Sequence, residues 1–175
     1  APGVVDARRC LSWLLQVDGD LPRPFREALG DRLYGCDDCQ EVCPPNRRRA
    51  RAGPAAPPAG PGAQPWVDLV DLLAATDDEL LARHGRWYVP KRQARYLRRN
   101  ALVVLGNVGD GRSPPVLDAL QAALASPDPL LRGHAAWAAK RMGRPDLAAG
   151  LADDPDPEVR AEALAQVAVR PGGAP

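Results

Sequence analysis

The chain has 175 residues, 45% of them apolar, which is enough for one ordinary domain or two small ones with a buried core. The formal net charge is +1, and all but two of the 23 basic residues are arginine, so the distribution of charge matters more than its total. No apolar run approaches the roughly 18 residues that a membrane span needs, and no charged-then-apolar leader opens the chain, so we expect a cytoplasmic protein.

Prolines and glycines predict how the chain is divided. They are concentrated in residues 52–65, which predicts a linker rich in Pro, Gly and Ala. Because the sequence begins at Ala1 and its only methionine is Met142, we also expect it to be part of a longer gene product. The predicted parts are a first region at 1–51, the linker at 52–65, a helical domain at 66–170 and a disordered tail at 171–175.

Two helices are predicted ahead of the clustered cysteines. Asp6 is placed to cap a first helix that carries Cys10 and continues through Leu15. A second helix is predicted for residues 24–34, where Gly35 ends it. The sequence leaves open whether the four arginines that follow the cysteines extend a basic surface or only solubilise the linker. These are Arg47, Arg48, Arg49 and Arg51.

Helices follow one another from residue 66 onward, and no strand pattern competes with them. The predicted helices are 66–75, 77–84, 91–108, 113–125, 129–142, 145–153 and 158–169. Three of them share a similar short segment that contains Arg98, Arg132 or Arg160, and the turns at 126–129 and 154–157 match. This pattern is typical of stacked HEAT-like repeats. We therefore predict that these arginines bond to turn carboxylates of a neighbouring repeat.

Three of the four cysteines lie close together, at Cys36, Cys39 and Cys43, and the fourth is Cys10. Disulfides are not expected in a reducing compartment, and charged neighbours argue against simple burial. A Cys-x2-Cys pair also occurs in zinc sites, but structural zinc sites take two well-separated pairs. Cys-x3-Cys-Pro ends the bacterial ferredoxin run, in which the cysteine before proline binds the second cluster. The spacing therefore favours iron-sulfur clusters over zinc.

The fold class that these patterns predict is mainly α. Half of a ferredoxin-like iron-sulfur region is followed by an α-α HEAT-like helical repeat domain. Three repeat units are about the minimum that can bury a continuous core, so a small array is expected.

A basic segment lies between Leu80 and Gly109, where the sequence has no carboxylate. Its cations are Arg83, Arg86, Lys91, Arg92, Arg95, Arg98 and Arg99. The last five are spaced as one stripe of a helix, with Trp87, Tyr88 and Tyr96 interleaved. Such a surface fits a phosphate backbone and an unpaired base, and the alternative is an ordinary solvated helix face. The two histidines, His84 and His134, are assigned no role.

The cysteine motifs resemble those of a known enzyme family. Asp6-Ala7-Arg8-Arg9-Cys10-Leu11-Ser12, Gly35-Cys36-Asp37-Asp38-Cys39-Gln40-Glu41-Val42-Cys43-Pro44 and Asn46-Arg47 are similar to epoxyqueuosine reductase. The match is close up to residue 47 and looser over the helical remainder, where residues 97–101 and 105–107 carry it. Trp13 and Pro45 stand where the family usually has tyrosine and tryptophan, and neither departure removes a ligand.

The resemblance implies two 4Fe-4S clusters beside a cobalamin, through which electrons reach the epoxide of epoxyqueuosine at the wobble position of a tRNA. It implies that Cys10, Cys36 and Cys39 hold one cluster and that Cys43 binds the other. The remaining ligands, the cobalamin-binding domain and the catalytic acid would lie upstream. This chain would then contain no catalytic residue, and we expect it to be inactive alone.

The resemblance also implies that the basic segment binds the anticodon region of a tRNA. The predicted tRNA-binding residues are Lys91, Arg92, Arg95, Arg99, Arg86, Trp87 and Tyr88. We expect a monomer with an unidentified electron donor and no membrane partner. Two alternatives stay open: a reductive dehalogenase-like iron-sulfur protein, and a non-catalytic HEAT-type scaffold with a zinc knuckle.

Overall fold

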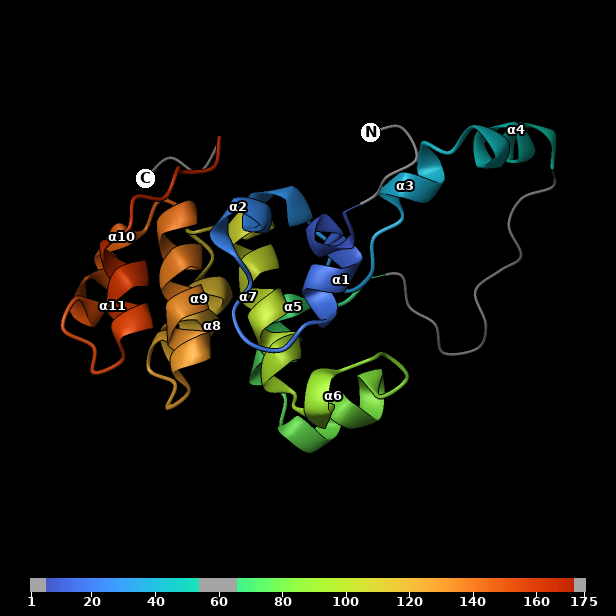
Figure 1. Cartoon of the computed structure of the whole chain (residues 1–175). Coiled ribbons are helices and arrows are strands. Elements are labelled where there is room, and N and C mark those ends of the chain that lie inside the picture. Colours follow the sequence, from blue (N-terminus) through green and yellow to red (C-terminus); the bar gives the residue numbers. More distant parts are fainter. Residues whose placement is uncertain (1–5, 54–65, 172–175) are drawn as a thin grey trace.

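The computed structural model describes residues 6–53 and 66–171 (Figure 1). Within these two ranges the regular elements are all helices, which confirms the predicted mainly α class. Most of the predicted linker and of the predicted tail lies outside the described residues. The division of the chain into two regions stays a prediction.

The first part of the chain contains short helices. They are η1 (Ala7–Arg9), α1 (Leu11–Gln16), α2 (Arg23–Arg26), η2 (Glu27–Leu29), α3 (Asp38–Glu41) and α4 (Pro44–Ala52), where η denotes a 3-10 turn. Two predictions about them are wrong. Asp6 caps only η1, and Cys10 has an extended backbone between η1 and α1, so it is not on a helix. The second helix ends before Gly30 rather than at Gly35, because Gly30 has a φ of 56° that no helix continues.

The second part contains longer helices. They are α5 (Leu69–Ala74), α6 (Asp77–His84), η3 (Pro90–Arg92), α7 (Arg95–Val108), α8 (Pro114–Leu124), α9 (Pro129–Arg141), α10 (Pro145–Ala148), η4 (Ala149–Leu151) and α11 (Pro157–Leu164). Side chains at their first turns explain where several of them begin. Asp68, Asp128 and Asp156 accept hydrogen bonds from first-turn N–H groups, and Thr76 forms a capping box with Glu79.

The predicted helix over residues 91–108 is shorter than expected, because α7 begins only at Arg95. Lys91 and Arg92 have φ values of 51° and 55°, in the left-handed region, and they belong to the separate turn η3. That region costs a non-glycine residue roughly 1–2 kcal/mol, so surrounding contacts must hold the turn in place. The predicted basic stripe is therefore not a single helix face.

Helices α7 and α9 form the centre of the fold and pack directly against each other (Figure 1). Gly106 of α7 allows this close approach, since an added Cβ would lie 2.7 Å from a ring atom of Trp137 on α9. Helices α5 and α8 pack beside them, and α10 and α11 pack on α9. Successive helices packed in this way are the arrangement of a helical repeat array.

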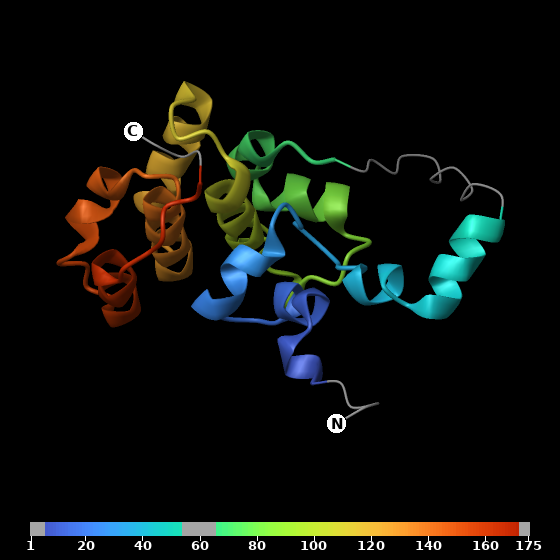
Figure 2. The ribbon, with the colours of Figure 1, turned by 90° about the horizontal axis from the view of Figure 1, so that it is seen from above.

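Leucines from the first part of the chain complete this core. Leu15, Leu21 and Leu29 are fully buried in one cluster with Leu102 of α7 and Trp137 of α9. Each buried leucine contributes about 1.5–3 kcal/mol. The segment from α1 to η2 is therefore packed onto the central helices, whereas α3 and α4 lie apart from this packed body (Figure 2).

Candidate functional site

The four cysteines lie beside short helices in the first part of the chain. Cys10 precedes α1, Cys39 is in α3, and Cys43 precedes α4. Gly35, with a φ of 78°, lets the chain turn just before Cys36. All four are free thiols, two of them exposed and two half-buried. Free and accessible thiols are the donor type that iron-sulfur clusters take.

The structure does not gather these sulfur atoms into one site. Within residues 6–53 and 66–171, no three Cys, His, Asp or Glu side chains lie close enough together to hold a metal ion. The chain supplies four cysteines, half of the set that a pair of 4Fe-4S clusters takes. The donor chemistry fits such clusters, and the assignment of each cysteine to one of them stays a prediction.

Polar side chains of α7 hold the stretch of chain between Cys10 and Cys36. We call Arg99, Asn100 and Asn107 the carbonyl clamp, because each donates hydrogen bonds to backbone carbonyls of that stretch. Arg99 reaches the oxygens of residues 15, 17 and 19 at 3.1, 2.9 and 2.6 Å. Asn100 Nδ2 reaches those of residues 15 and 33 at 2.9 and 3.2 Å. Asn107 Nδ2 reaches those of residues 26 and 30 at 2.8 and 3.1 Å.

Arg99 is the deepest member of the carbonyl clamp. It is fully buried, and its guanidinium lies 5.3 Å above the ring of Tyr96. Burial lowers its pKa to about 10, an effect that the nearby carboxylate of Asp20 partly offsets, so it stays charged at neutral pH. The prediction that Arg99 binds tRNA is therefore wrong, because the backbone of residues 15–19 covers the side chain that would have to reach a phosphate.

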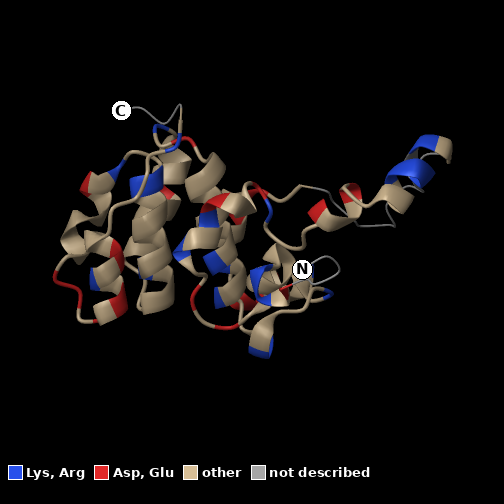
Figure 3. Ribbon diagram, turned by 45° about the horizontal axis from the view of Figure 1, so that its top comes forward, with Lys and Arg blue, Asp and Glu red and all other residues tan. Residues whose placement is uncertain are grey.

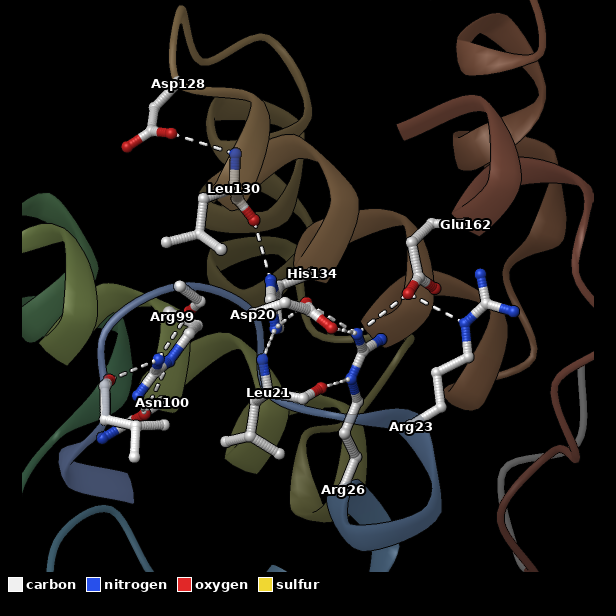
Figure 4. Close-up of polar contacts among 12 residues, drawn as sticks. Asp20, Leu21, Arg23, Arg26, Arg99, Asn100, Asp128, Leu130, His134 and Glu162 are labelled. Carbon is white, nitrogen blue, oxygen red and sulfur yellow. Dashed lines mark hydrogen bonds and ion pairs between the residues drawn. The ribbon is translucent and has the colours of Figure 1, made fainter. Parts of the chain in front are cut away.

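A second buried network joins the same stretch to α9 and α11 (Figure 4). The fully buried Arg26 donates to the carbonyl of Leu21 at 2.6 Å and to the carboxylate of Glu162 at 2.8 Å. It also donates to Asp20 at 3.1 Å. Arg23 shares the same oxygen of Glu162 at 2.8 Å. Glu162 thus ties two arginines of α2 to the last helix of the array.

His134 lies at the centre of this network. Its Nδ1 is 2.8 Å from the carbonyl oxygen of Leu130, and its Nε2 is 3.4 Å from the backbone nitrogen of Leu21. Because the carbonyl only accepts and the N–H only donates, these contacts favour a neutral ring with its proton on Nδ1. Burial, followed by the charge of Arg26, lowers the pKa of His134 well below its ordinary value of 6.5. The histidine therefore has a structural role.

The remaining cations predicted to bind tRNA differ in their partners. Lys91 pairs with Asp18 at 2.7 Å, and Arg95 pairs with Asp128 at 2.7 Å. Both ion pairs connect neighbouring segments of the fold. Arg92 is exposed and donates to the carbonyl of residue 85 at 3.1 Å. The structure therefore does not present these side chains as one free basic surface.

The two aromatic residues predicted to bind tRNA also differ. Trp87 stacks on Tyr34, with 4.7 Å between ring centroids, and on His84, with 4.4 Å. These contacts hold the loop after α6 against the first part of the chain. The side chain of Tyr88 is 63% exposed, and Arg86 beside it is exposed as well. The side chains of Tyr88, Arg86 and Arg92 are exposed, as an RNA contact requires. Their role stays a prediction.

The arginines shared by the repeats have structural partners. Arg98 donates to the carboxylate of Asp77 at 2.5 Å, and Arg132 donates to both oxygens of Asp154 at 2.8 Å. These contacts confirm the predicted bonds to turn carboxylates. Arg160 differs, because it reaches the backbone carbonyls of residues 154 and 155 at 2.6 and 3.1 Å.

Comparisons with known proteins give two matching family models and several similar enzymes. A model described as "4Fe-4S double cluster binding domain" matches residues 1–46, and one described as "HEAT repeats" matches residues 90–168. Epoxyqueuosine reductase of Bacillus subtilis is 36% identical over 166 residues, 92% of this chain and 42% of that protein. The Pseudomonas aeruginosa enzyme is 40% identical over 152 residues, 81% of this chain and 39% of that protein. Over most of its length this chain is similar to one part of the epoxyqueuosine reductases.

A solved epoxyqueuosine reductase aligns with the fold as well. The crystal structure of an epoxyqueuosine reductase with an epoxyqueuosine-modified tRNA-Tyr stem loop has a TM-score of 0.72 and 32% identity, and the match covers 93% of this chain and 44% of that chain. The present chain spans about two fifths of the length of the curated relatives named above. Among its described residues, no helix is long and apolar enough to cross a bilayer.

Helix α4 is one of the elements that the sequence did not predict. Proline at the first position and the arginine and alanine residues that follow favour a helix, and this signal lay within the segment assigned to the approach to the linker. Figure 3 shows its basic residues gathered on one helix, with acidic residues on the neighbouring segment.

Proposed function

We propose that this chain is the part of an epoxyqueuosine reductase that supplies half of its iron-sulfur ligands and contacts its tRNA substrate. The whole enzyme would convert epoxyqueuosine to queuosine at the tRNA wobble position. One observation carries the proposal: the candidate ligands Cys10 and Cys36 stand at the two ends of one segment, and helices of the repeat array hold that segment through buried hydrogen bonds. The relatives named above support it.

The residues of this chain would hold the cofactors as follows. Cys10, Cys36 and Cys39 would bind one 4Fe-4S cluster and Cys43 the second, each as a thiolate. The clusters, when bound, supply one-electron transfer. Cobalamin would be held by residues outside this sequence. The work of the chain itself is to fix the backbone between the ligands, which the carbonyl clamp does from α7.

The proposed partners follow from the same assignment. The anticodon region of a tRNA would contact the exposed side chains near the loop after α6, namely Arg86, Tyr88 and Arg92. A separate protein or small molecule would donate electrons. Because the proposed substrate is a tRNA, we expect the enzyme to work in the cytoplasm. We also expect it to be a monomer.

Metal analysis tests the cofactor part of the proposal. A longer protein that carries this chain should contain about eight iron atoms with matching sulfide, as two 4Fe-4S clusters require. Cys39→Ala should lower the iron by about four atoms per chain, since one cluster loses a ligand. Asp37→Asn, a neighbouring exposed change, should leave the iron content unaltered. Stoichiometric zinc without iron would contradict the assignment.

An activity measurement tests the reaction. Cells that lack their own epoxyqueuosine reductase should accumulate epoxyqueuosine in tRNA, and the longer protein should convert it to queuosine, as measured by mass spectrometry of digested tRNA. The 175-residue chain alone should not do so. Full conversion by a longer protein that carries Cys39→Ala would contradict the proposed role of the cysteines.

A further inference from the structure

Helix α4 presents four arginines to solvent: Arg47, Arg48, Arg49 and Arg51 are all exposed. No ion pair involves any of them within residues 6–53 and 66–171. We call residues 38–53, which comprise α3 and α4, the basic arm. Its second helix contains no acidic residue, and the two carboxylates of the arm, Asp38 and Glu41, lie in its first helix.

The arginines of α4 differ from the cations of the central helices in their partners. Cations on α7 and α9 such as Arg95, Arg99 and Arg132 are bonded to carboxylates or to backbone carbonyls. On α4, Arg47 and Arg51 are one turn apart, and like charges at that spacing destabilise a helix. Four cations within five residues therefore weaken the isolated helix, and binding of a polyanion relieves this repulsion.

The composition of α4 indicates which kind of polyanion fits. Apart from Asn46 and the arginines, the helix contains only proline and alanine. A membrane-surface helix needs a large apolar face, which this sequence does not provide. Arginine side chains present a planar fork that bonds two oxygens of one phosphate. A sugar-phosphate backbone is therefore a better match than a lipid surface.

The position of α4 ties this surface to the cysteines. Asn46 Nδ2 donates to the side-chain oxygen of Gln40 at 2.8 Å and to its backbone carbonyl at 3.2 Å. Gln40 lies in α3 next to Cys39, and α4 begins directly after Cys43. A phosphate backbone bound to α4 would thus be held beside the candidate cluster ligands.

We propose that the basic arm is an RNA-binding surface, in which Arg47, Arg48 and Arg51 contact the phosphate backbone of the tRNA. At 100° per residue these three positions share one side of α4, and Arg49 lies off that side. The inference rests on the proposed function only in naming tRNA as the RNA. The arm binds without reading sequence, because phosphate contacts position an RNA and carry no base information.

A binding titration on the complete 175-residue chain tests this surface. The probe is a labelled anticodon stem loop of a tyrosine tRNA, followed by fluorescence anisotropy between about 50 and about 200 mM salt. Arg47→Gln with Arg51→Gln should weaken binding about tenfold and lower the slope of log affinity against log salt by about 1 to 2. Arg47→Lys with Arg51→Lys should keep most of the slope, because the charge remains.

Controls separate a surface effect from unfolding. Glutamine forms helices about as well as arginine, so circular dichroism of the double glutamine variant should match that of the parent chain. Arg144→Gln removes a charge from a surface ion pair next to α10 and should leave RNA affinity unchanged. Vesicles rich in phosphatidylserine should bind far more weakly than the stem loop.

The outcomes distinguish a failure of the RNA-binding proposal from a failure of the proposed reductase function. An unchanged affinity and salt slope in the double glutamine variant would contradict the proposal that the basic arm binds RNA. Equal binding to the vesicles would contradict it as well. Neither result affects the proposed reductase function. If the arm binds RNA as described but the longer protein fails to reduce epoxyqueuosine, the RNA-binding proposal is supported and the proposed reaction is contradicted.

Discussion

Two parts of the first 53 residues, the segment from α1 to η2 and the basic arm, are held in place very differently. The segment from α1 to η2 buries leucines against α7 and α9, and its carbonyls are bonded by the carbonyl clamp. The basic arm is exposed, and its contacts, such as that between Asn46 and Gln40, lie near the surface. Substitutions in the clamp should therefore change stability, whereas those in the arm should change binding.

The largest effect in this comparison is expected for Arg99→Met. The change removes the side-chain donor from the covered carbonyl oxygens of residues 17 and 19 and leaves that of residue 15 with Asn100 alone. The free energy of unfolding should therefore fall by about 3 to 5 kcal/mol. Urea unfolding followed by circular dichroism measures it. Arg92→Gln, at an exposed position of the same basic segment, serves as the control and should cost less than about 0.5 kcal/mol.

Asn100→Ala should cost somewhat less, about 2 to 3 kcal/mol, since two carbonyl contacts are lost and Arg99 loses an acceptor. In the longer protein this substitution should also shift the midpoint potential or the paramagnetic resonance spectrum of the bound clusters, because the backbone leading to Cys10 and Cys36 is released. A spectrum identical to that of the parent protein would show that the clamp does not reach the ligands.

Acidification should weaken the clamped segment through His134. The unfolded chain takes up a proton near the ordinary pKa of 6.5, whereas the folded ring, buried and facing Arg26 and Arg99, does not. Stability should thus be complete above about pH 7 and decline as the pH falls below about 6.5, by up to about 1.4 kcal/mol per pH unit. Asp20 faces Nε2 at 3.2 Å and would moderate the decline. His134→Gln should remove this slope, measured as unfolding midpoints between about pH 7 and about pH 5.5.

The smallest effect on stability is expected in the basic arm. Replacing Arg47 and Arg51 by glutamine should change the free energy of unfolding by less than about 0.5 kcal/mol, with the sign favouring the variant because like charges are removed. The same variant is the one expected to lose RNA affinity. A loss of stability as large as that of the clamp variants would show that the arm is packed more firmly than its exposure indicates.

Sequence reasoning succeeded where the signal was local. The turns before α9 and α11 each carry an Asp at the cap and a Pro at the first helical position, and both helices begin at the predicted turns. Arg132 was predicted to reach a turn carboxylate, and it bonds Asp154. The start of α7 was predicted wrongly at residue 91. Lys91 and Arg92 have a left-handed backbone, and no glycine at these positions indicates it in the sequence.

The sequence by itself determined the cysteine spacing, the helical repeats and the family that these motifs resemble, because each depends on residues that are near one another along the chain. It could not distinguish the buried Arg99, which is structural, from the exposed arginines of α4. Only the tertiary structure decided that question. The carbonyls that bury Arg99 lie 80 to 84 residues away in the chain, and no pattern within α7 records that a second segment covers its polar side.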